Sequence, residues 1–164
     1  LRMHIRQLLF SEFSDPALAQ DAAKALRTGL TRTMQQFPFL AGSLRLADAK
    51  MDRVSLQYPD SISDGVIDQI FTVSYDQVEN PDLEFAKMET AGFLPLPIWG
   101  DVFCPKLLRS YPGLEDEFAV RLVSFNKGVP VPVLAAQATF VRGGLVLSVY
   151  AHHSAIDGTG LAIV

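Results

Sequence analysis

The chain has 164 residues, 49% hydrophobic and 20% charged, which is enough apolar material for one globular domain of ordinary size. A net charge of -4 and the lack of a Lys/Arg cluster exclude the basic surface that nucleic acids and anionic membranes require. No stretch approaches the roughly 20 apolar residues of a membrane span, and the single cysteine precludes an internal disulfide, so a cytoplasmic location is expected.

The first third of the chain predicts a strand followed by a long helix. Residues 3–10 mix alternation with apolar character, as a strand does, and His4 within them is interpreted as a core residue on the flank. Ser14 or Asp15 can cap the free N–H groups of a helix, and Pro16 suits its first turn. Before Pro38, apolar residues recur at every fourth position and predict one stripe packed on a sheet: Leu18, Ala22, Leu26, Leu30 and Met34.

The middle of the chain predicts a corner, short strands and an irregular stretch. Residues 37–44 join a proline that cannot continue a helix to a glycine that permits a sharp turn, so a helix-to-strand corner is expected. One or two strands are expected over residues 44–58, around a turn at 48–50, and residues 66–75 form another short apolar stretch. Residues 76–88 are weakly helical, and repeated prolines indicate irregular structure over residues 94–112.

Three strands are predicted near the end of the chain, over residues 118–125, 131–141 and 145–150. The segments that separate them, Asn126-Lys127-Gly128 and Gly143-Gly144, have the composition of turns that join antiparallel strands. Because proline cannot donate to a ladder, the strand that contains Pro132 is expected to start at a sheet edge or to be unpaired at its start.

The last predicted strand runs into the segment His152-His153-Ser154-Ala155-Ile156-Asp157-Gly158. A histidine at an abrupt turn can meet a substrate, and imidazole exchanges protons near neutral pH. A metal site is disfavoured because no glutamate lies between the ligands and no third ligand is evident. A nucleophilic serine is disfavoured because the G-x-S-x-G elbow is missing. The glycines after the aspartate break the helix that a His–Asp pair at this spacing would need.

This segment resembles the HHxxxDG signature of acyltransferases built like chloramphenicol acetyltransferase. It is most similar to that of the BAHD acyltransferases and their fungal relatives of the trichothecene 3-O-acetyltransferase type. The corner Phe37-Pro38-Phe39-Leu40-Ala41-Gly42-Ser43 also resembles the aromatic-Pro-Leu-Ala-Gly-Arg segment of that family, with Ser43 in place of arginine. Residues 133–145 are similar to fungal members at the same distance before the histidines, so the resemblance runs through the whole chain in order.

The resemblance implies an α/β fold of two layers, with a mixed, largely antiparallel sheet flanked by helices. It implies an acyl-CoA-dependent O-acyltransferase in which His153 is the general base. His152, Asp157 and Gly158 would be structural, with the aspartate turned from the substrate to pair with an arginine, and the glycine leaving room for the acyl donor. Acyl-CoA would be a co-substrate, an alcohol or amine of secondary metabolism the acceptor, and no permanent cofactor or metal is expected.

The family has two similar domains with the active-site channel between them, and the second contributes an Asp-Phe-Gly-Trp-Gly segment that this sequence lacks. Residues 1–164 are therefore expected to form the N-terminal half of a two-domain fold, whose missing C-terminal domain is its partner. Two alternatives stay open. One is a condensation domain of a nonribosomal peptide synthetase, which carries the same signature and uses carrier-protein thioesters. The other is an inactive half-domain that binds a partner chain through an exposed apolar face.

Overall fold

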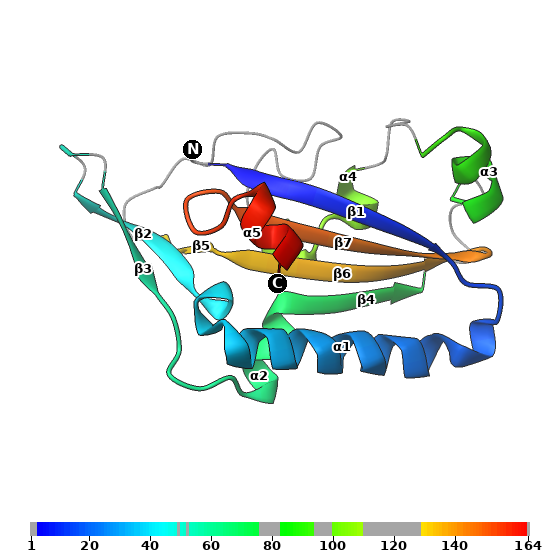
Figure 1. The fold of residues 1–164 in the computed structure, drawn as a ribbon, viewed down its shortest axis with the longest axis horizontal. Helices are drawn as coiled ribbons and strands as arrows, with labels where there is room; N and C mark the ends of the chain where they lie inside the picture. Colours follow the sequence, from blue (N-terminus) through cyan, green and yellow to red (C-terminus); the bar gives the residue numbers. More distant parts are fainter. Residues whose placement is uncertain are drawn as a thin grey trace.

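The computed structural model describes residues 3–48, 50–51, 53–75, 83–93, 100–109 and 129–163. It contains helices, short 3-10 turns and strands in mixed order (Figure 1). The strands are β1 (His4–Glu12), β2 (Ser43–Asp48), β3 (Arg53–Gln57), β4 (Phe71–Tyr75), β5 (Val131–Pro132), β6 (Leu134–Val141) and β7 (Gly144–His152). The α-helices are α1 (Ala19–Gln36), α2 (Asp64–Ile70), α3 (Phe85–Thr90), α4 (Gly100–Phe103) and α5 (Gly158–Ile163). The 3-10 turns are Pro16–Leu18, Pro38–Ala41 and Lys106–Leu108.

The larger of two sheets has the strand order β1-β7-β6-β4, and the smaller has the order β3-β2-β5. In the larger sheet β7 pairs antiparallel with both β1 and β6, whereas β4 pairs parallel with β6. The predicted α/β fold with a mixed, largely antiparallel sheet is therefore confirmed. The strand that contains Pro132 begins as β5, which pairs with β2 of the smaller sheet before the chain continues into β6.

The start of the long helix follows the sequence prediction closely. The side chain of Asp15 accepts a hydrogen bond from the backbone N–H of Ala17, and Pro16 occupies the first position of the 3-10 turn that leads into α1. Met34 near the other end is fully buried, as the predicted stripe requires. The placement of Leu18 on that stripe was wrong, because Leu18 lies in the preceding turn and is 52% exposed.

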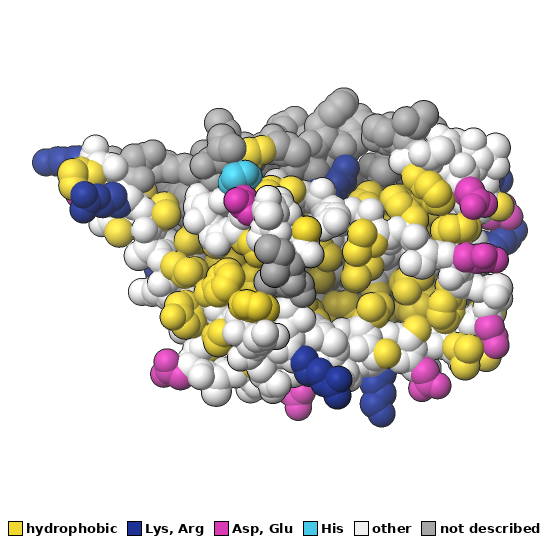
Figure 2. All heavy atoms as spheres, viewed as in Figure 1, with side chains coloured by type: hydrophobic (Ala, Val, Ile, Leu, Met, Phe, Trp, Pro, Cys, Tyr) yellow, Lys and Arg dark blue, Asp and Glu magenta, His cyan; other side chains and the backbone are white. Residues whose placement is uncertain are grey.

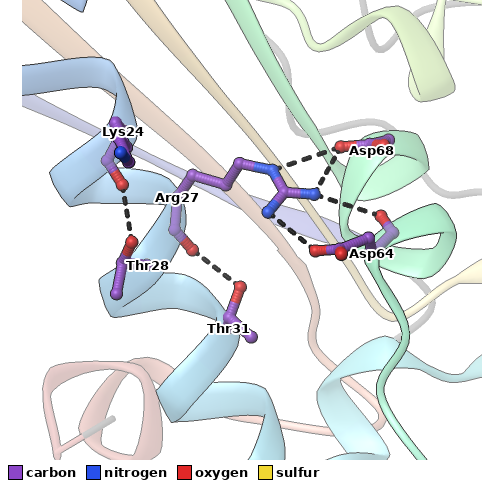
Figure 3. Close-up of polar contacts among 6 residues, drawn as sticks. All are labelled: Lys24, Arg27, Thr28, Thr31, Asp64 and Asp68. Atoms are coloured by element: carbon purple, nitrogen blue, oxygen red, sulfur yellow. Dashed lines mark hydrogen bonds and ion pairs between the residues drawn. The ribbon is translucent and has the colours of Figure 1, made fainter. Parts of the chain in front are cut away.

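Arg27 fastens α1 to α2 (Figure 3). Its guanidinium donates to Asp64 Oδ1 at 2.9 Å and to Asp68 Oδ1 at 2.7 Å, one turn apart on α2. Hydrogen bonds to Asp68, then to Asp64, raise the pKa of Arg27. Both carboxylates are largely exposed, so water and salt screen this contact, and it orients the two helices more than it stabilises them.

Alternation along β1 and β7 separates the two faces of the larger sheet. Leu8 and Phe10 of β1 pack with Val146 of β7 and with side chains of α3 on one face. On the opposite face α1 runs roughly along the strands (Figure 1), and Leu147 of β7 and Leu30 of that helix both pack against the main hydrophobic core.

The segment of residues 66–75 differs from the sequence analysis in one respect. It divides into the end of α2 and the strand β4, since Ile67 and Ile70 are buried at helical spacing and Phe71 begins an alternating pattern. The predicted strand at 118–125 lies outside the described residues, as do residues 94–99 and 110–112 of the stretch predicted to be irregular, whereas its residues 100–109 contain α4 and a 3-10 turn. Among the described residues, none of the helices combines the length and hydrophobicity that crossing a bilayer requires.

Candidate active site

The motif forms a tight turn at the end of β7. His152 is the last residue of the strand, and its carbonyl accepts hydrogen bonds from the N–H groups of Ala155 and Ile156 at 2.9 and 3.2 Å. The N–H of His153 donates to the carbonyl of Met3 at 2.8 Å, which fastens the turn to the start of β1. The backbone that carries His153 is thus held from both sides, so its position is well defined before any substrate binds.

His153 itself is half-buried and lines an open hollow of about 610 Å³. The other walls are Phe37, Phe39, Ser154, Ala155, Ile156, Asp157 and Gly160. The two phenylalanines come from the corner after α1, far from the motif in sequence, and their rings meet edge to face. The structure therefore brings together the two segments that the sequence analysis singled out, and it adds an aromatic wall that the analysis did not assign to the site.

His152 has a different environment from its neighbour. It is fully buried, and its Nδ1 accepts a hydrogen bond from the N–H of Ser154 at 3.2 Å. Burial, with smaller contributions from electrostatic repulsion with the protonated forms of His4 and His153, lowers the pKa of His152 to about 3. The ring is therefore neutral at physiological pH and is held inside the fold.

Asp157 is exposed and shapes the loop rather than binding the histidine. Its Oδ1 accepts a hydrogen bond from the N–H of Gly160 at 2.7 Å, which caps the first turn of α5. No hydrogen bond joins Asp157 to His153 within the described part of the chain, so a His–Asp pair of the hydrolase type has no support there. The resemblance implies an arginine paired with Asp157, and among the described residues no arginine forms an ion pair with it.

The two glycines after Asp157 differ in the space around them. A Cβ added at Gly158 would meet no atom within 4 Å, whereas one at Gly160 would lie 2.9 Å from Ile156 Cγ1. Gly160 therefore needs a small residue because Ile156 lies close to it, a constraint that the sequence did not reveal. Gly158 lies open toward solvent. The described residues contain no group of three or more His, Cys, Asp or Glu side chains placed to hold a metal ion.

The model of one protein family, described as the trichothecene 3-O-acetyltransferase-like N-terminal domain, matches residues 5–164. The chain belongs to this family. It is 28% identical to the trichothecene 3-O-acetyltransferase TRI101 of Fusarium sporotrichioides over 90% of its own length and 29% of that protein. The chain therefore spans less than a third of the curated relative that it matches.

Solved structures of the same enzyme share the fold. The crystal structure of F. sporotrichioides TRI101 complexed with coenzyme A and T-2 superposes with a TM-score of 0.71 at 22% identity, over 98% of this chain and 34% of that one. The F. graminearum TRI101 complex with coenzyme A and deoxynivalenol superposes with a TM-score of 0.70 at 18% identity, over 96% of this chain and 32% of that one. The predicted acyltransferase fold of this family is thus confirmed.

Proposed function

We propose that this chain is the N-terminal domain of an enzyme that transfers an acyl group from acyl-CoA to a hydroxyl or amine of a small metabolite, with His153 as the general base. One observation carries the proposal: within a family named for an acetyltransferase, the motif histidine lies half-buried on an open hollow, with its backbone fixed from both sides. Coenzyme A in the related crystal structures supports an acyl-CoA donor.

The proposed reaction needs one proton carrier. The imidazole of His153 takes the proton of the acceptor O–H while the oxygen attacks the thioester carbonyl carbon. The tetrahedral intermediate then collapses, the C–S bond breaks, and the imidazolium returns the proton to the thiolate of CoA. No acyl-enzyme forms, so neither Ser154 nor His153 becomes acylated. No resident metal or cofactor takes part, and an acyl-CoA donor agrees with the expected cytoplasmic location.

The neighbours of His153 have supporting roles in this proposal. The ring of His152 is buried and neutral, so it places no positive charge beside the base. Asp157 caps α5 and fixes the loop, whereas Gly158 leaves the approach to the hollow open. The walls formed by Phe37 and Phe39 suit an apolar acceptor skeleton, since such sites combine aromatic walls with few polar groups.

A second domain is part of the proposal. The face between α1 and the larger sheet carries an apolar groove of about 480 Å³, lined in part by Leu9, Leu26, Leu30, Leu147, Val149 and Leu161. Leu9 is 45% exposed there. Figure 2 shows hydrophobic side chains gathered across the middle of this face, with charged side chains around its edges. An apolar surface of this kind is suited to burial, and we assign its cover to the remaining part of the protein.

The experiment is to supply the full-length protein with acetyl-CoA and a panel of terpenoid alcohols and amines, and to detect free thiol and acylated product together. The proposal predicts thiol and product in equal amounts. A parallel reaction supplies the same acyl group on a carrier protein. Transfer from the carrier but not from CoA would favour the condensation-domain alternative, which the family match disfavours. Absence of transfer from both donors would favour the inactive half-domain.

A further inference from the structure

The start of β1 lies directly opposite the motif. His4 is the register partner of His152 across the β1–β7 ladder, and it is fully buried. The two imidazoles meet edge to face, with ring centroids 5.0 Å apart and planes at 83°. His4 Nε2 lies 3.0 Å from the carbonyl oxygen of Pro132, which belongs to β5. One side chain of the first strand thus contacts both the motif and the segment that leads into β6.

The contacts continue from this ring to the turn. His152 Nδ1 accepts from the N–H of Ser154, so the proton of the neutral ring resides on Nε2. Rotation of the His152 ring would break that hydrogen bond. The edge contact with His4 blocks such a rotation, so the two rings together fix the position of the Ser154 N–H. The backbone of His152 is held as well, since its N–H donates to the carbonyl of Val133 at 2.7 Å.

A buried imidazole at position 4 is a costly way to fill space. Its Nδ1 has no hydrogen-bond partner among the described residues, and burying an unpaired polar atom is unfavourable. Burial lowers the pKa of His4 to about 4, against a smaller opposing effect of the hydrogen bond to Pro132, so the ring stays neutral. An apolar side chain would fill this space without that cost, which indicates that the N–H donated to Pro132 has a purpose.

We propose that His4 is a positioning residue of the acyltransferase: its hydrogen bond to Pro132 and its edge contact hold His152, and through the N–H of Ser154 it sets the turn that presents His153. This inference rests on the proposed function. His4 touches no reacting atom, so it acts only through the geometry of the turn. A misplaced base lowers the catalytic rate far more than it weakens substrate binding. The reason is that reacting groups must approach within a few tenths of an ångström of their productive positions.

The test compares three variants of the full-length protein. His4→Phe keeps an aromatic ring, somewhat larger than imidazole, and removes the donor, whereas His4→Gln places an amide N–H near the position of Nε2. Leu8→Ala, on the same strand and the same face, is the control for a general loss of β1 packing. We expect His4→Phe to lower kcat about tenfold or more while the KM for acyl-CoA changes less than about twofold. His4→Gln restores most of kcat, and Leu8→Ala lowers the melting temperature with kcat unchanged.

Hydrogen exchange of the backbone N–H groups at 153–156 gives a second readout that requires no activity. His4→Phe should speed this exchange about tenfold or more, whereas His4→Gln and Leu8→Ala should leave it as in the wild type. Wild-type kcat in His4→Phe, or wild-type exchange at the turn, would overturn the positioning role and leave the proposed function standing. If the wild-type protein transfers no acyl group, the proposed function fails, and exchange alone then decides whether His4 orders the turn.

Discussion

The pair of buried histidines makes the stability of this chain sensitive to acid. The pKa values of His4 and His152 are lowered by burial to about 4 and about 3 in the folded chain. In the unfolded chain both return to their ordinary value near 6.5. Below pH 6.5 the unfolded state therefore binds more protons than the folded state. The free energy of unfolding is at its full value above that pH and decreases as the pH falls toward 4.

The magnitude follows from the two pKa values of His4. At about pH 5, protonation of this imidazole stabilises the unfolded state by a factor of roughly 30, which is RT ln 30 or about 2 kcal/mol. The folded state gains almost nothing, because its imidazole has a pKa of about 4. His152 adds a comparable loss at the same pH. For a domain of ordinary stability, which is about 5–15 kcal/mol, this is a large share.

Urea denaturation followed by circular dichroism measures this loss, on the wild-type chain and on His4→Phe, at about pH 7.5 and about pH 5. Phenylalanine binds no proton, and losses from other groups cancel between the two proteins. We expect the wild type to lose about 2 kcal/mol more than His4→Phe when the pH is lowered. An equal loss in both proteins would refute the assignment of a neutral, buried imidazole at position 4.

Three further predictions concern a pair of glycines, Arg27 and Asp157. Gly42→Ala should destabilise the chain by about 1–3 kcal/mol, because the new Cβ would lie 2.6 Å from the carbonyl oxygen of Gln57. Gly29→Ala should instead stabilise α1 by about 0.5–1 kcal/mol, because a new Cβ there would meet no atom within 4 Å. Urea denaturation measures both changes. Arg27→Met should lower the melting temperature slightly, and high salt should abolish the difference from wild type. Asp157→Ala should cost about 1 kcal/mol through loss of the α5 cap and lower the rate of thiol release, whereas Asp157→Asn, which can still accept, should lose less of both.

Local sequence patterns were sufficient for the parts of the fold where one period runs long enough. The four-residue spacing in α1 persists over several turns, and β6 and β7 are long apolar runs separated by Gly143-Gly144, so the helix and the hairpin were predicted. The division into α2 and β4 was missed because each period lasts only a few residues there. The parallel pairing of β4 with β6 depends on contacts remote in sequence, which no local pattern contains.

The candidate site divides in the same way. His153 and Asp157 could be singled out because the motif is contiguous, and Phe37 and Phe39 belonged to a segment already marked as similar to the family. That this segment forms a wall of the same hollow depends on how the corner after α1 folds back toward β7. His4 offered no signal, since a lone histidine on a strand usually belongs to the core, and its place opposite His152 follows from a strand register that the sequence does not display.

The most direct test of the account is the rate of thiol release from acyl-CoA by the full-length protein carrying His153→Ala, at saturating donor and alcohol. Thr159→Ala is the matched control, because Thr159 is exposed on α5 and does not line the hollow. The account predicts that His153→Ala loses about 10²–10⁴-fold in kcat, with acyl-CoA binding retained and the control unchanged. Turnover by His153→Ala at the wild-type rate would contradict the central claim that this histidine is the base.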